Sequence, residues 1–493
     1  MIKKRNASYR AIFSIIIAAI TFAVIYFDYY ASYIGIVAQL ALAALVLVAS
    51  GLAIRTSMGF KGGYGVYMLS GKHGISQVDA IAKSSPDFWN ALAMWGMVLG
   101  FGLLSYPLLR GRGGKKIFAV GIISIFLIII FVLPFLSYAL IFISLPRFDL
   151  LSNSAFSTSL PTPGMLLGNF VSGGIYEYAL RAIIIVTGFS GYIVILLLAN
   201  AGLVVSSLIK SISISSLAPL HSQTPGVAPV IPGIDLPLVS GILSLAIILI
   251  IHEFSHGILA RNFKVKLKSI GLLIFGVIPI GAFVEPDDKE VNRLDHAKQN
   301  RIFSAGISAN MLAMVIFLIP MLVLLPYILH NVYGSGVFVY STIKGYPAYG
   351  VIKPGTEIYS WDNHAISNIT QLQSIAGLDR VGSLVSVSTS TGNYTFVAKS
   401  YNSSSDIGLI GVDLYEKYFP LTNTGAKSVA YFFYSLFGIS FMLNFLVAVV
   451  NLLPVPGFDG WRIYANSISS KKVLNALTAI VIIALLVNVL PWI

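Results

Sequence analysis

Long apolar runs constrain this chain more than any other feature of its sequence. Each approaches or exceeds the roughly 20 residues that a helix needs to cross the hydrocarbon of a bilayer. We count about nine, at 11–27, 33–54, 88–109, 117–145, 182–208, 236–260, 302–329, 427–450 and 473–490. Only 10% of the 493 residues are charged, against about 25% in a soluble protein. We therefore expect a polytopic α-helical membrane protein.

Charge and cysteine content exclude several classes of function. The net charge of +13 fits basic loops beside a membrane. The sequence contains no basic patch interleaved with aromatic residues, so we do not expect nucleic-acid binding. The first apolar run follows a basic N-terminus, and we interpret it as an uncleaved signal anchor. Since the chain has no cysteine, disulfides and thiolate metal sites are excluded. Any metal ligand must be His, Asp or Glu.

The distribution of Lys and Arg predicts the orientation of the spans. With the N-terminus inside, alternation places the basic loops at 55–83 and 261–268 on the inner side. The loop RGRGGKK (110–116) disagrees, because alternation would place it outside. Either this loop breaks the rule or the count of spans before residue 180 is wrong. The same alternation places 330–426 on the outer side.

Residues 331–420 differ in composition from the rest of the chain. They are rich in Ser, Thr, Asn, Gly and Tyr, and they alternate like strands in GVFVYSTI (336–343) and SLVSVSTS (383–390). Three N-x-S/T sequons, which mildly favour the exterior side, start at Asn368, Asn393 and Asn402. We expect one small β-rich extramembrane domain.

The segment 269–290 is apolar, but it is too interrupted by Gly and Pro for a simple helix.

One apolar run carries groups that a lipid-facing helix avoids. ILIIHEFSHGILA (248–260) holds two imidazoles and a carboxylate, and ionisable groups at membrane depth are costly and usually functional. His252 and His256 share one helix face at spacing i, i+4, so both can reach one metal ion. Glu253 completes an H-E-x-x-H pattern, in which the carboxylate takes a proton from water. The alternative is a pair of structural histidines satisfied by hydrogen bonds.

A catalytic zinc ion usually takes three protein ligands and a water, so a third ligand should lie elsewhere. Asp459 is the best candidate because it follows an apolar span, whereas most other carboxylates lie in polar loops. The cluster Pro454, Pro456 and Gly457 must break that helix and leave polar backbone that only a cavity or site tolerates. The sixth and eighth spans also both end on the inner side. The alternative is an ordinary helix-terminal aspartate.

Taken in order, these motifs resemble the site-2 protease family of intramembrane zinc metalloproteases. The resemblance is carried by HEFSHGILA (252–260), SAGISAN (304–310) and NLLPVPGFDG (451–460). It covers roughly 230–493. The segments PGIDLPL (232–238) and GAFVEPDD (281–288) look closest to archaeal members.

The resemblance implies one Zn²⁺ per chain, with a defined role for each matching residue. It implies that His252 and His256 bind the ion, that Asp459 is the third ligand and that Glu253 is the catalytic carboxylate. One departure is Phe458, where the family usually has Leu, and it puts only fine positioning in doubt.

Further residues match the family's supporting elements. Gly306 and Asn310 resemble a G-x-x-x-N element in the intervening helix. Asn451, Pro454 and Pro456 match an N-x-x-P-x-P lead-in, whose broken backbone is thought to help bind an unwound substrate.

The resemblance also implies a domain organisation. It suggests that 269–290 forms membrane-associated β structure at the edge of the active site. The exterior segment resembles a PDZ domain through GYPAYGVIKPGTEIYSWDNHAI (345–366); the alternative is a generic β-rich domain. We expect an N-terminal transmembrane region at 1–230, catalytic parts at 231–330 and 421–493, and the PDZ-like domain at 331–420.

The expected function is regulated intramembrane proteolysis, with transmembrane proteins as substrates and the lipid bilayer as surroundings. The protein would lie in the cell membrane, with its active site near the cytoplasmic side. A transporter or channel would explain the spans, but neither the His spacing nor Asp459 with its proline lead-in. A sensor protein with a vestigial site would be expected to have lost some of the four key residues, and all are present.

Overall fold

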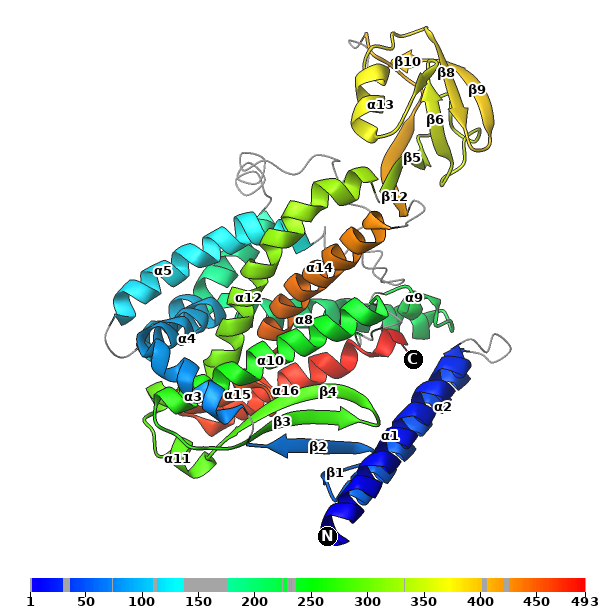
Figure 1. The fold of residues 1–493 in the computed structure, drawn as a ribbon. Coiled ribbons are helices and arrows are strands. Elements are labelled where there is room, and N and C mark those ends of the chain that lie inside the picture. Colours follow the sequence, from blue (N-terminus) through cyan, green and yellow to red (C-terminus); the bar gives the residue numbers. More distant parts are fainter. Residues whose placement is uncertain are drawn as a thin grey trace.

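Long helices form the main body of the protein, with a β-sheet along one side and a separate β-rich domain at the opposite end (Figure 1). The computed structural model describes residues 2–29, 36–72, 74–109, 113–136, 175–223, 225–227, 230, 232, 236–331, 333–400, 406–420 and 425–492. Seven helices in this part of the chain are long and apolar enough to cross a membrane, at 86–108, 114–135, 178–213, 238–262, 296–328, 427–450 and 471–492. Their length and composition agree with the predicted helical membrane protein.

Each predicted span contains a helix. The first two are α1 (Ile2–Tyr29) and α2 (Ile36–Met58), whose described apolar stretches are shorter than the seven above. The others form α4 (Pro86–Phe101) with η1 (Gly102–Leu108), α5 (Gly114–Leu127) with η2 (Ile128–Val132) and η3 (Leu133–Phe135), α8 (Ile175–Ser213), α10 (Leu238–Asn262), α12 (His296–Asn331), α14 (Ala426–Val450) and α16 (Lys471–Val487). The end of the span predicted at 117–145 lies outside the described residues, as does 110–112 of the exceptional loop. The number of nine stays a prediction.

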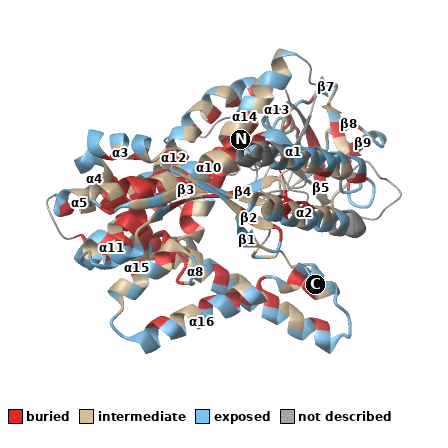
Figure 2. Cartoon of the chain, turned by 60° about the horizontal axis from the view of Figure 1, so that its bottom comes forward, coloured by how far each residue is buried: buried red, intermediate tan, exposed pale blue. Residues whose placement is uncertain are grey.

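Short helices lie between these spans or, in the case of η5, after α16. They are α3 (Ile75–Ser84), α9 (Ala218–His221), α11 (Asp288–Asn292), α15 (Asp459–Ser467) and η5 (Leu490–Trp492). Buried side chains concentrate around α4, α10 and α12, whereas α1 and α16 are largely exposed (Figure 2). α4, α10 and α12 therefore form the buried centre of the bundle.

Two of the long helices break where they cross. α4 ends and α8 kinks because Gly102 and Gly188 have left-handed φ values of 55° and 66°. A Cβ at Gly188 would lie 2.3 Å from the carbonyl oxygen of Gly100, so the two backbones touch. Next to this crossing, the hydroxyl of Tyr464 on α15 donates to Ser190 Oγ on α8 at 3.1 Å. The N-terminal spans thus support the short helix that begins at Asp459.

A four-stranded antiparallel sheet lies against α10 and α3. Its order is β1 (Lys61–Gly63), β2 (Val66–Gly71), β3 (Leu267–Phe275) and β4 (Ile278–Pro286). The β structure predicted within 269–290 is present as the β3–β4 hairpin. The sequence did not predict that β1 and β2, from the N-terminal region, would extend this hairpin. Polar backbone groups of β3 thereby gain hydrogen-bond partners on both sides.

The β-rich domain spans 333–420 and is called the β domain below. Its main sheet has the order β12 (Val412–Pro420), β5 (Tyr333–Thr342), β6 (Glu357–Trp361), β8 (Leu384–Thr389) and β9 (Gly392–Val397), with β7 (His364–Ala365) beside β6. Helix α13 (Ile369–Ala376) and the pair β10 (Lys399–Ser400) and β11 (Gly408–Leu409) complete it. The strands predicted at 336–343 and 383–390 are those of β5 and β8.

Candidate active site

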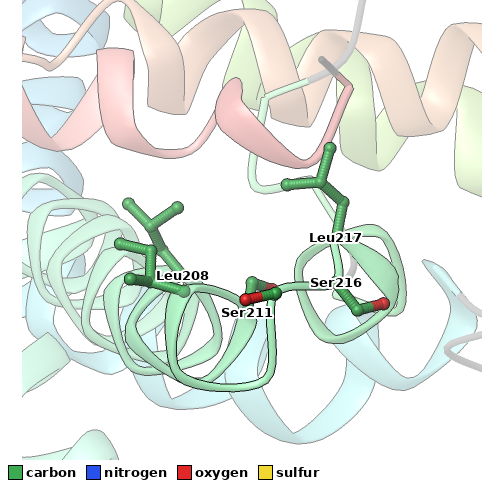
Figure 3. A pocket seen from close by; sticks show the side chains of 6 residues that line it. Leu208, Ser211, Ser216 and Leu217 are labelled. Carbon is green, nitrogen blue, oxygen red and sulfur yellow. The ribbon is translucent and has the colours of Figure 1, made fainter.

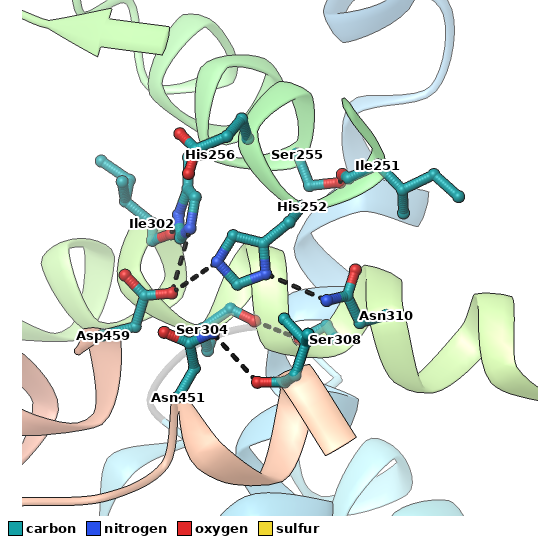
Figure 4. A network of polar contacts seen from close by, with 12 residues as sticks. Ile251, His252, Ser255, His256, Ile302, Ser304, Ser308, Asn310, Asn451 and Asp459 are labelled. Atoms are coloured by element: carbon teal, nitrogen blue, oxygen red, sulfur yellow. Dashed lines mark hydrogen bonds and ion pairs between the residues drawn. The ribbon is translucent and has the colours of Figure 1, made fainter. Parts of the chain in front are cut away.

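Helix α10 brings two imidazoles together on one face. The ring centroids of His252 and His256 lie 4.9 Å apart, as the i, i+4 spacing predicts (Figure 4). Their Nε2 atoms both approach one carboxylate oxygen, Oδ2 of Asp459, at 3.0 and 3.1 Å. The structure therefore joins two motifs that lie far apart in the sequence.

Asp459 reaches the imidazoles because the chain turns sharply between α14 and α15. Asn451 directly follows α14, and its carbonyl accepts a hydrogen bond from Gly460 N at 2.7 Å, which closes the intervening loop. Pro454 and Pro456 lie in this loop and prevent α14 from continuing. Asp459 is then the first residue of α15. The carboxamide of Asn451 donates to Val447 O and does not contact the imidazoles directly.

The tautomer of His256 suits a metal ligand. Its Nδ1 lies 2.7 Å from the carbonyl oxygen of Ile302, which can only accept. Nδ1 therefore carries the proton, and the lone pair of Nε2 points toward Asp459. Main-chain carbonyls commonly orient metal-binding imidazoles in this way.

The surroundings of His252 lead to the same arrangement. Nδ1 of His252 lies 3.2 Å from Nδ2 of Asn310. Oδ1 of Asn310 is buried and has no hydrogen-bond partner among the residues that the structure describes. A half-turn of the carboxamide, which leaves its shape unchanged, brings this oxygen to Nδ1 as an acceptor. His252 then also presents a free lone pair at Nε2.

These residues fit a zinc ion. Two imidazole nitrogens and one carboxylate oxygen, all within 4.8 Å of one another, match the ligand types and number of a catalytic zinc site. The predicted ligands His252, His256 and Asp459 are thus brought together by the fold.

Gly306 is the residue of α12 that lies against both rings. A Cβ at this position would lie 2.5 Å from Cε1 of His252 and 2.6 Å from Nε2 of His256. Only glycine lets α12 pass the imidazoles this closely, so the predicted supporting role has a steric basis.

Glu253 follows His252 on α10 and links the ligand cluster to the sheet. Its Oε2 accepts a hydrogen bond of 3.3 Å from the main-chain nitrogen of Val284 on β4. The predicted catalytic carboxylate therefore lies beside the edge strand of the four-stranded sheet. Sequence reasoning missed both Val284 N and Ile302 O, because main-chain groups leave no signal in the residue type.

A pocket at the end of α8 lies apart from the cluster of His252, His256 and Asp459. It is lined only by Leu, Ile and Ser side chains, namely Leu208, Ser211, Ile212, Ser215, Ser216 and Leu217 (Figure 3). With no ionisable group in its lining, it offers no candidate for catalysis.

Comparison with known proteins matches the half of the chain that contains this cluster. The sequence profile described as peptidase family M50 matches residues 240–490, about half of the chain. An uncharacterized protein of Methanocaldococcus jannaschii, MJ0971, is 29% identical over 245 residues, which are 48% of this chain and 60% of that protein. The chain thus covers less than two thirds of the length of this curated relative. The family match includes His252, Glu253, His256 and Asp459 and leaves the N-terminal spans outside.

Proposed function

We propose that this chain, which belongs to peptidase family M50, is an intramembrane zinc metalloprotease that cleaves peptide bonds within or near the transmembrane segments of other proteins. The observation that carries the proposal is the convergence of His252 Nε2, His256 Nε2 and Asp459 Oδ2. A zinc ion bound there would lower the pKa of its water to about 7 and polarise the scissile carbonyl.

The protein's own groups supply orientation and proton transfer. The Ile302 carbonyl and the Asn310 carboxamide hold the two imidazoles with Nε2 toward the ligand cluster. Glu253 accepts a proton from the attacking water and then delivers it to the leaving amide nitrogen. The bond from Val284 N keeps Oε2 of Glu253 directed toward the sheet edge.

The sheet edge also suits binding of an unwound substrate. A helical substrate hides its backbone in hydrogen bonds, so it must unwind before hydrolysis. β4 is an edge strand whose main chain lies beside Glu253, and an extended peptide can add to such an edge. The broken backbone from Asn451 to Pro456 offers a second place for such pairing.

The arrangement of the spans supports an active site near the cytoplasmic side of the cell membrane. α10 ends in a basic loop, 261–268, as inner loops do. The β domain lies at the opposite end of the bundle, which would be the exterior (Figure 1). If this domain is PDZ-like, it could bind a new C-terminus or exclude large ectodomains. We propose that the role of the protein is the regulated cleavage of membrane-anchored proteins.

The test compares the wild type with Glu253→Gln in proteoliposomes that contain a labelled single-span substrate. We expect the variant to keep about one zinc per chain, measured by mass spectrometry, and to lose cleavage by roughly 100- to 10,000-fold. Glu290→Gln on α11, where the carboxylate accepts from Lys266 N, is the matched control and should cleave normally. Retained cleavage by Glu253→Gln would refute the role of Glu253 as the general base. Metal flux into vesicles without proteolysis would favour a transporter.

A further inference from the structure

A short N-terminal unit, β2 with α3, reaches the active site from outside the family-matched residues. β2 pairs along β3, from Val66 opposite Phe275 to Gly71 opposite Ile270. α3 follows directly and lies beside the end of α10 (Figure 1). The N-terminal region therefore contacts both the catalytic helix and the sheet beside it.

Asp79 on α3 holds the last turn of α10. Its carboxylate accepts from Nε of Arg261 and, at 3.0 Å, from Nη2 of the same guanidinium. Nη1 of Arg261 also donates to the carbonyl of Val265 at 3.1 Å, where the chain turns toward β3. Bidentate pairs of this kind fix direction as well as distance. Arg261 lies little more than one helical turn beyond His256.

A tight contact of three elements lies beside this ion pair. Val78 on α3 is fully buried, with 0% exposure. A Cβ at Gly257 on α10 would lie 2.8 Å from Cγ1 of Val284 and 3.5 Å from Cγ1 of Val78. α3, α10 and β4 therefore meet at one point. Val284, at this point, is also the residue whose main-chain nitrogen binds Glu253.

We propose that Asp79 is a positioning residue for peptide hydrolysis. Through Arg261 it fixes α10 against the sheet, and thereby holds the Glu253 carboxylate at the Val284 amide. Because a misplacement of about 1 Å at a reacting group can reduce the rate roughly 100-fold, the ion pair matters for catalysis although it lies outside the cluster. This inference rests on the proposed protease function.

The first experiment needs no substrate. Hydrogen exchange of the β4 peptide is measured in the full chain for the wild type, Asp79→Ala and the control Asp87→Ala, which removes an exposed carboxylate at the start of α4. We expect faster exchange on β4 in Asp79→Ala only. Equal exchange in all three proteins would overturn the inference.

The second experiment measures kcat and KM. We expect Asp79→Ala to lower kcat by about 10- to 100-fold, while KM, zinc content and melting temperature stay at wild-type values. The double variant Asp79→Arg with Arg261→Asp, in which the two charged residues are exchanged, should recover most of the kcat that either single change loses. Loss of zinc or a lower melting temperature in step with kcat would show a merely structural ion pair.

The outcomes separate this inference from the protease function itself. If the wild type and Asp87→Ala cleave and Glu253→Gln does not, the protease function holds, and unchanged kcat in Asp79→Ala refutes only the role of Asp79. If the wild type fails to cleave any transmembrane substrate, both proposals fail together.

Discussion

The helix bundle buries polar side chains more deeply than the β domain does. The β domain buries Val337, Val339, Ile358, Val385 and Val387 at 1% exposure or less. The bundle buries polar residues just as deeply, among them Ser244, Ser304, Ser308, Asn310, Ser440 and Asn444. Its large aliphatic residues are often exposed instead, and Val323 on α12 is 72% exposed.

This difference follows from the surroundings of each region. In water, burial of apolar surface drives folding, so alternation of apolar residues marks the core of the β domain. Lipid tails are as apolar as leucine, so helices in a bilayer associate through close packing and hydrogen bonds between small or polar residues. Ser304 Oγ on α12 donates to Ala93 O on α4 at 3.0 Å, and Ser440 Oγ donates to Ser244 Oγ at 3.0 Å. The polar positions of the spans therefore mark their inner faces.

The largest expected effect concerns the most polar point of the bundle. Asp459→Ala should reduce bound zinc from about one per chain to a small fraction, because it removes one of three ligands. The loss in affinity should exceed the roughly 10- to 100-fold effect of losing an outer hydrogen bond. Mass spectrometry of the purified protein measures it, with Asp413→Ala in the β domain as the control. If the zinc content is unaffected by Asp459→Ala, Asp459 is not a ligand. The buried polar residues of the bundle would then not form one zinc site, which would break the comparison with the β domain.

A smaller effect is expected at Asn310, which contacts His252 and is not one of the three proposed ligands. Asn310→Leu should weaken zinc binding by about 10- to 100-fold, because Nδ1 of His252 loses its acceptor. Asn310→Asp should keep zinc, because a carboxylate also accepts from Nδ1–H. Competition with a zinc-sensitive dye measures both affinities. Equal losses in the two variants would show that Asn310 donates to His252, contrary to the tautomer inferred above.

Sequence reasoning succeeded where side-chain type carries the information. The strands β5 and β8 follow from alternation, and the imidazole pair follows from its spacing. The proximity of Asp459 to the imidazoles was predicted because zinc chemistry requires a third ligand and because the proline segment had to break a helix, and its role as a ligand stays a prediction. In each case a short pattern and one physical rule were enough.

Sequence reasoning failed where the contact is long-range or involves the main chain. The pairing of β2 with β3 joins Val66 to Phe275, and neither segment indicates the other. The Asp79–Arg261 ion pair is equally non-local, and Val284 acts through its amide nitrogen. The reason for glycine at 306 also became evident only once α12 lay against the imidazoles.

A third prediction compares the two cores directly through one buried methylene. Ile358→Val in β6 should cost about 1 kcal/mol of local stability, the usual effect in a water-soluble core. Ile125→Val in α5, at a site with 0% exposure, should cost less, because lipid rather than water surrounds the separated helix. Hydrogen exchange of the full chain in lipid nanodiscs gives both values from peptides of β6 and α5. Equal costs would mean that apolar burial stabilises both regions alike.

The smallest expected effect is a pH dependence confined to the β domain. Burial raises the pKa of the Asp379 carboxyl. The hydrogen bond of 2.9 Å from Trp361 Nε1 lowers this pKa, and the neighbouring Asp362 raises it, so that the net shift is upward. A raised folded-state pKa stabilises the fold fully below the unfolded-state pKa of about 3.9, and this stabilisation is lost as pH rises through the folded-state value. Exchange on β6 should therefore slow as pH falls from 7 toward 4, after correction for the intrinsic exchange rate. Asp379→Asn keeps an acceptor for Trp361 and should remove this dependence. If the variant and the wild type respond equally to pH, a group other than Asp379 is responsible, and the Asp379 carboxylate is as well solvated as one at the surface.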